Sequence, residues 1–102
     1  MLPEEQVWQA LRAVIDPELG INIVDLGLVY SVEVQEGQVH VAMTMTTPAC
    51  PLHTYITSSS EAAIWQTVPN IRSVEIQLVW NPLWNPLMMT SAAKQMLGWE
   101  TK

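Results

Sequence analysis

The chain has 102 residues, of which 49% are hydrophobic and 14% charged, and its net charge is −6. This composition excludes a disordered chain, and four basic residues are too few to track nucleic-acid phosphates. No apolar run approaches the about 20 residues of a membrane-spanning helix, the start lacks the pattern of a signal peptide, and one cysteine excludes an internal disulfide. We therefore expect one domain over residues 1–102, located in the cytoplasm, without nucleic-acid or membrane partners.

The first predicted element is an amphipathic helix over residues 3–15. Val7, Leu11, Val14 and Ile15 share one side of it, and Pro3 followed by two glutamates favours a helix start. Residues 16–20 then predict a turn, because a residue before proline avoids helical backbone. An apolar connector over residues 21–27 follows the turn.

Three predicted strands share one pattern of alternating apolar and polar residues. They cover residues 28–35, 38–46 and 73–80, and the first two are joined by a short hairpin turn. Because each strand is apolar on one face only, we expect an α/β (α+β) fold with two layers. This fold has a small three-stranded mixed sheet, helices on one face, and the element order α-β-β-α-β-α. The second and third strands should be parallel, since one helix separates them; the first strand could lie between them.

The same alternation predicts which side chains form the core. Thr44, His40 and Ala42 fall on the outward face of the second strand, whereas its other side chains face inward. We expect seven side chains to be nearly fully buried: Leu11, Val32, Val41, Met43, Ile56, Ile76 and Leu78.

The only cysteine, Cys50, lies between the second strand and a helix predicted over residues 51–67. Pro51 suits the first helical position, which places Cys50 at the N-cap. Free backbone N–H groups and the helix dipole there favour thiolate over thiol, and His53 follows on the same turn. The sequence thus predicts a reactive or metal-binding sulfur.

Several roles remain open for Cys50 and its neighbours. Cys50 could be a buried structural residue, a metal or cluster ligand, a nucleophile with His53 as base, or a redox sensor. His53 could equally cap the helix or face solvent. Asp16, Glu18 and Asp25 lie in turns, where aspartate commonly caps the backbone, but Asp25 is also a candidate for chemistry near Cys50. One thiolate cannot hold a cluster alone, so any cluster must be shared with another chain.

The C-terminal part is a rigid loop over residues 81–89 and a short helix that ends at Leu97 before Gly98. Trp84, Leu87, Met88 and Met89 form an apolar run in this loop. Such a run predicts a homodimer or partner contact unless it folds back onto the chain.

Three motifs resemble those of one family. Residues 16–18 with 22–30 resemble its opening motif, residues 46–51 its cysteine motif, and residues 78–84 with 90–91 and 97–98 its C-terminal motif. On these residues the chain resembles the metal-sulfur cluster biosynthetic domain family, which includes PaaD-like and SufT-like proteins. Two positions depart from the family pattern: Ala49 replaces a frequent glycine, and Asn81 replaces a frequent acid.

The resemblance implies a non-enzymatic accessory factor in iron–sulfur cluster assembly or in transfer to client proteins. The alternative is a non-catalytic subunit or maturation factor of a multicomponent aromatic-ring oxygenase. Expected partners are the iron–sulfur assembly machinery, client apoproteins and a second copy of the chain. The expected cofactor is a transient iron–sulfur cluster or iron shared between chains, with Cys50 as metal ligand and His53, Asp25 and Glu18 as further binding residues. The family's conspicuous positions fall here on Asp16, Glu18, Asp25, Gly27, Thr46, Cys50, Pro51, Trp80, Pro82 and Trp84.

Overall fold

The computed structural model of the chain describes residues 2–46 and 53–98. Its helical elements are α1 (Pro3–Leu11), α2 (His53–Thr67), the 3₁₀ turn η1 (Pro86–Met88) and α3 (Ser91–Leu97). Its strands are β1 (Ile15–Asp16), β2 (Ile21–Asn22), β3 (Val29–Gln35), β4 (Gln38–Met43) and β5 (Ser73–Leu78). None of the helices within these two ranges is both long and apolar enough to cross a membrane.

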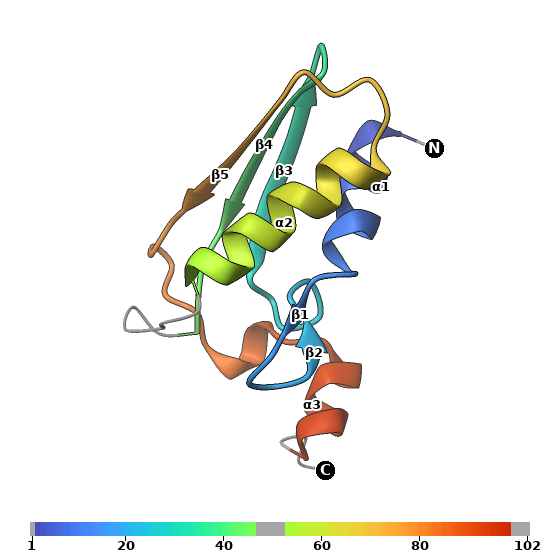
Figure 1. Cartoon of the computed structure of the whole chain (residues 1–102). Coiled ribbons are helices and arrows are strands. Elements are labelled where there is room, and N and C mark those ends of the chain that lie inside the picture. The colour runs from blue at the N-terminus through green and yellow to red at the C-terminus, as the bar shows by residue number, and fades with distance from the viewer. Residues whose placement is uncertain (1, 47–52, 99–102) are drawn as a thin grey trace.

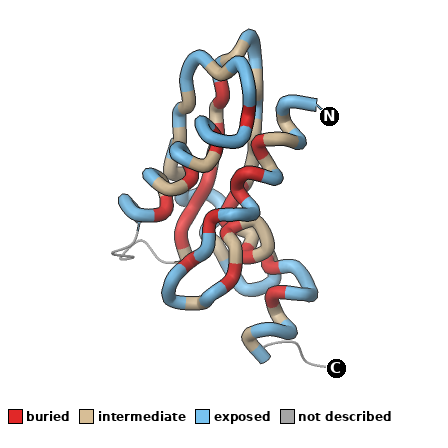
Figure 2. Tube along the Cα trace, turned by 45° about the vertical axis from the view of Figure 1, so that its right-hand side comes forward, coloured by how far each residue is buried: buried red, intermediate tan, exposed pale blue. Residues whose placement is uncertain are grey.

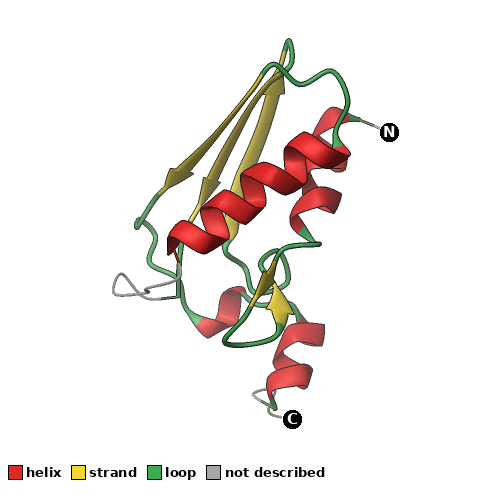
Figure 3. Ribbon diagram, in the orientation of Figure 1, coloured by secondary structure: helices red, strands yellow, loops and turns green. Residues whose placement is uncertain are grey.

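The main sheet has the strand order β3-β4-β5, with β4 in the centre. β4 runs antiparallel to β3 and parallel to β5, so the expected mixed sheet is confirmed and β3 does not lie between the other two. Helices α1 and α2 pack side by side on one face of this sheet (Figure 1; Figure 3). The two-layer α+β architecture is therefore confirmed.

The first helix is shorter than predicted. It ends at Leu11, because Ile15 and Asp16 form the small antiparallel ladder β1–β2 with residues 21–22. Strand pairing removes Ile15 from the helical stripe and leaves it 44% exposed. The predicted end of the second helix at Thr67 is confirmed, whereas its predicted start at Pro51 lies outside the described residues.

A bulge also changes the first strand. The register shifts between Val29 and Ser31, so Tyr30 has no direct partner in β4. Pairing begins at Val29, and the fully buried Leu28 precedes the strand. A continuous alternation through this segment cannot hold, because a bulge inserts one residue without a partner.

The core lies between the helices and the sheet (Figure 2). Leu11, Val41, Met43 and Ile56 are all 0% exposed, as predicted. The prediction was wrong for Val32, Ile76 and Leu78, which are only partly buried. These three belong to the edge strands β3 and β5, which have a neighbouring strand on one side only, whereas Val41 and Met43 belong to the central strand.

Candidate functional site

The candidate site surrounds the segment that leaves the central strand. Past the end of β4, the backbone N–H of Thr44 donates to the carbonyl of Leu28 at 2.8 Å. The N–H of Val79, just after β5, donates to the carbonyl of Met43 at 2.8 Å. The first described residues of α2 lie at this same end of the sheet (Figure 1). The ends of β4 and β5 and the first described residues of α2 therefore lie at one end of the sheet.

Cys50 itself lies outside the described residues, as do Pro51 and the predicted N-cap geometry. His53 is the first described residue of α2, and it is exposed. Its predicted partnership with Cys50 therefore remains a prediction.

Asp16 has a defined structural role. Its side chain is 4% exposed, and Oδ1 accepts hydrogen bonds from the backbone N–H groups of Glu18 (2.8 Å) and Leu19 (3.3 Å). Its carbonyl oxygen accepts the N–H of Gly20 at 2.7 Å. Asp16 thus closes the turn between β1 and β2, as the capping alternative predicted, and this turn presents Glu18 as an exposed residue.

Asp25 is also fixed by hydrogen bonds. Its Oδ2 accepts from Nδ2 of Asn22 at 2.9 Å, and its backbone N–H donates to Oδ1 of the same Asn22 at 2.9 Å. The carbonyl oxygen of Asp25 accepts the N–H of Thr90, the N-cap of α3, at 2.9 Å. Asp25 therefore ties the opening motif to the C-terminal helix, a contact that sequence spacing did not predict.

The C-terminal loop is docked on the opening motif at three further points. The indole Nε1 of Trp84 donates to the carbonyl of Leu26 at 2.7 Å, and the hydroxyl of Tyr30 donates to the carbonyl of Pro82 at 2.8 Å. Gly27 has φ +79°, and a Cβ there would collide with the backbone carbonyl of Met88. Residues 25–30 and residues 82–90, whose contacts span more than 50 positions in sequence, thus pack together, and we call this pair of segments the platform.

This docking buries most of the apolar run that was predicted to contact a partner. Trp84 and Met88 are partly buried, and Met89 is 4% exposed. Only Leu87 of the four remains strongly exposed, at 82%. Trp80, the last residue of the predicted third strand, lies beyond the end of β5 and is exposed. The chain therefore covers much of the surface that composition alone assigned to a partner.

Thr44 is a feature that the sequence did not reveal. The alternation placed it on the outward face, but it is fully buried. Its hydroxyl Oγ1 has no hydrogen-bond partner in the part of the chain that the structure describes. Its backbone N–H is bonded to the carbonyl of the equally buried Leu28, where the end of the sheet meets the start of β3.

The described residues do not by themselves form a metal centre. Among residues 2–46 and 53–98, no group of three or more His, Asp and Glu side chains could hold a metal ion. The side chains of Glu18 and Asp25 have separate surroundings: Glu18 is exposed in the turn between β1 and β2, whereas Asp25 is bonded to Asn22.

Known proteins are similar to this chain in sequence and in fold. The model of a family described as iron–sulfur cluster assembly protein matches residues 4–78. The chain is 42% identical to an Fe–S protein maturation auxiliary factor of Bacillus subtilis, over 93% of each chain. It is 37% identical to an iron–sulfur cluster carrier protein of Synechocystis, over 76% of this chain and 22% of that longer protein. A crystal structure of a domain of unknown function from Bacillus anthracis superimposes with a TM-score of 0.92 at 39% identity, covering 96% of this chain and 93% of that one.

Proposed function

Because the chain belongs to the iron–sulfur cluster assembly protein family, we propose that it is an accessory factor that helps to build iron–sulfur clusters or to transfer them to client proteins. The observation that carries this proposal is the match to a maturation auxiliary factor over 93% of both chains. The similar carrier protein supports transfer as well as assembly. Both names describe auxiliary or carrier proteins, which supports a role in binding and delivery and not in enzymatic turnover.

In this proposal the working atom is the sulfur of Cys50. A thiolate is a soft ligand that suits iron–sulfur clusters, and Cys50 is the only cysteine. The described residues do not supply a complete set of metal ligands. One thiolate cannot hold a cluster alone, so in this proposal another chain supplies the missing thiolate ligands, and the cluster or iron is cargo that is held transiently between two chains.

We assign supporting roles to His53, Asp25 and Glu18. His53 is exposed near the start of α2, so its imidazole is available as a second ligand or a proton acceptor. Asp25 and Glu18 are carboxylates, which suit iron ions better than a sulfide-bridged cluster. Asp25 would exchange its hydrogen bond with Asn22 for such an ion.

The partners follow from the same chemistry. A shared cluster needs a donor and an acceptor, which we take to be the assembly machinery and client apoproteins in the cytoplasm. A second copy of the chain would supply a second Cys50 thiolate, so a homodimer is one way to complete the ligand set.

The test replaces Cys50 and follows cluster delivery under anaerobic conditions. Cys50→Ala and Cys50→Ser are compared with the original chain by the rate at which a purified client apoprotein acquires its cluster, measured by absorbance and by iron and sulfide content. Serine lacks the soft sulfur but caps a helix well, so Cys50→Ser should retain the stability of the chain and lose delivery. Delivery at the original rate by Cys50→Ser would contradict the role of the sulfur, and a docking role such as that of an oxygenase subunit would replace it.

A further inference from the structure

The first observation concerns the free edge of β3. Gln35 and Gln38 flank the two-residue hairpin turn and form a hydrogen-bonded pair, and such pairs alternate along an antiparallel ladder. The backbone N–H and C=O groups of Val32 and Val34 therefore point away from β4, toward the edge of the sheet. Outside the ladder, neither residue forms a backbone hydrogen bond within the described ranges. An edge of this kind can pair with a further strand.

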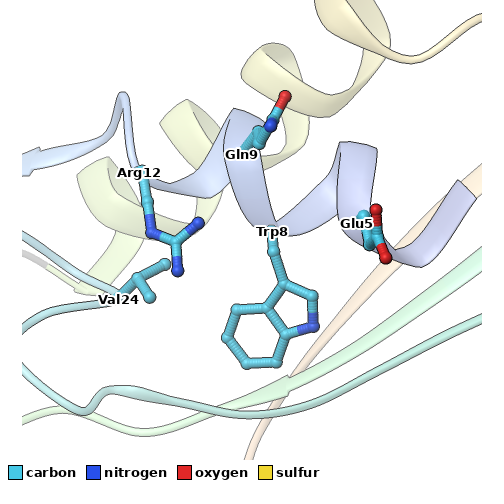
Figure 4. Close-up of a pocket in the computed structure, with 5 residues that line it drawn as sticks. All are labelled: Glu5, Trp8, Gln9, Arg12 and Val24. Atoms are coloured by element: carbon cyan, nitrogen blue, oxygen red, sulfur yellow. The ribbon is translucent and has the colours of Figure 1, made fainter. Parts of the chain in front are cut away.

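The second observation is a groove between α1 and the start of β3, with Trp8 and Val24 as its central apolar residues. One hollow of about 530 Å³ is lined by Trp8, Arg12 and Val24 together with Glu5 and Gln9 of α1. Figure 4 shows Trp8 pointing from α1 toward the strands, with Arg12 and Val24 on one side and Glu5 on the other.

A second hollow continues the first. It measures about 560 Å³ and is lined by Val29, Tyr30, Pro82 and Met88 among others. Trp8 and Val24 line both hollows, so they form one groove that reaches from α1 to the start of β3. α1 itself packs on β3.

The residues around this edge indicate which side chains an added strand should carry. Side chains of an added strand alternate between the two faces of the sheet. Those on the helix side would meet Trp8 and Val24, which favours apolar residues, whereas Glu5 and Arg12 of the same hollow carry opposite charges and favour neither sign there. Those on the other side would lie beside Glu33, which is exposed on the outer face of β3. Glu33 favours a basic residue in that position.

A second copy of the chain fits this edge less well. Pairing two β3 strands would bring the Glu33 side chains of both copies onto one face, and each chain carries a net charge of −6. Like charges directly opposite each other destabilise a strand pair.

We propose that the β3 edge and the groove under Trp8 bind an extended segment of a partner protein in which apolar and basic residues alternate. The segment adds a strand to the sheet, so backbone hydrogen bonds to Val32 and Val34 hold it in register. Its apolar side chains fill the groove, and its basic side chains pair with Glu33. This surface is a protein-docking function in addition to the proposed role of Cys50, and it does not depend on that role.

The probe is a capped synthetic peptide of alternating valine and lysine, with the same length as β3, seven residues. It is titrated into the ¹⁵N-labelled full chain, and amide hydrogen exchange is measured by NMR. We expect slower exchange at the amides of Val32 and Val34 and a shift of the Trp8 indole resonance. A peptide of the same composition with its valines and lysines in separate blocks should bind at least about tenfold more weakly, since it cannot match both faces.

Three changes test the geometry. N-methylation of the peptide amides that face β3 removes backbone donors and should weaken binding about tenfold. Trp8→Ala should weaken binding through the groove, and Glu33→Lys should weaken it through charge. The matched control Glu61→Lys changes the same charge at an exposed position on α2 and should leave binding unchanged within about twofold.

Several results would overturn the proposal. These are no binding, binding without protection of Val32 and Val34, and equal affinity for the N-methylated peptide. If sedimentation shows a dimer that already protects these two amides without peptide, the occupant is a second copy and not a partner segment.

Discussion

The sheet with its two covering helices and the platform of loops at its end are stabilised in different ways. In the sheet region, buried apolar side chains of the central strand β4 pack against those of the helices, as Val41 and Ile56 illustrate. In the platform, single polar contacts join distant segments, as Trp84 does with Leu26 and Tyr30 with Pro82. Truncations in the buried core of the first region should cause the largest losses of global stability, whereas the loss of a single polar contact in the second should cost less and also change the shape of the candidate site.

The strongest test of this contrast is truncation in the core. Leu11→Ala removes a fully buried side chain where α1 meets the rest of the core, and it should lower the free energy of unfolding by about 2–5 kcal/mol. Ile76→Ala, on the edge strand β5, should lower it less because Ile76 is only partly buried. Urea denaturation of both variants measures the difference. A larger loss for Ile76→Ala would mean that the edge strand contributes more to stability than the fully buried core under α1.

The next largest effect is expected at Gly27 in the platform. Gly27→Ala places a Cβ against the backbone carbonyl of Met88 at a φ of +79°, so both strain and collision oppose it. We expect a loss of about 2–3 kcal/mol in the free energy of unfolding, or release of the C-terminal loop.

Gly20→Ala is the matched control for this substitution. Gly20 has a φ of +71°, but no atom lies within 4 Å of an added Cβ. Its loss should be about 1 kcal/mol, from backbone conformation alone. Equal losses for the two variants would show that the contact between Gly27 and Met88 contributes nothing.

The amino-acid pattern predicted the sheet better than the platform, for physical reasons. Alternation reports which face of a strand is buried, so the two-layer fold and the parallel pairing of β4 with β5 were predictable. It does not report which strand is central, and hence Val32 and Ile76 were assigned to the deep core. A bulge at Tyr30 and the early end of α1 depend on pairings that local patterns do not encode.

The candidate site was predictable only in part. The turn role of Asp16 follows from local chemistry, because an aspartate before proline commonly caps its own turn. The contacts of Trp84 with Leu26 and of Asp25 with Thr90 join segments that are far apart in sequence. Their partners depend on the fold, so no local signal could identify them. The predicted chemistry of Cys50 stays a prediction.

A smaller effect is expected from the hydrogen bonds of the platform. Trp84→Phe keeps the ring but removes the N–H that donates to Leu26, so it should cost about 1 kcal/mol in the free energy of unfolding. Hydrogen exchange should become faster in residues 81–90 and remain unchanged in β4. Faster exchange throughout β4 would contradict the separation between platform and sheet.

The smallest expected change in stability is at Thr44, where the sheet meets the platform. Thr44→Val keeps the shape of the side chain and removes a buried hydroxyl without a hydrogen-bond partner among the described residues. An unpaired buried hydroxyl is unfavourable, so the free energy of unfolding should stay the same or rise by up to about 1 kcal/mol. Thr44→Ser is the control, because it keeps the hydroxyl but opens a methyl-sized cavity and should therefore be destabilising.

Thermal melts of both variants, combined with the client maturation assay, separate two possible roles of the Thr44 hydroxyl. If Thr44→Val is more stable and delivers clusters normally, the hydroxyl is only a local defect of packing. If it is more stable but delivers clusters more slowly, the hydroxyl takes part in the function and its cost to stability is explained. A clear loss of stability would instead show that the hydroxyl has a hydrogen-bond partner in solution, and Thr44 would then belong to the polar contacts of the platform.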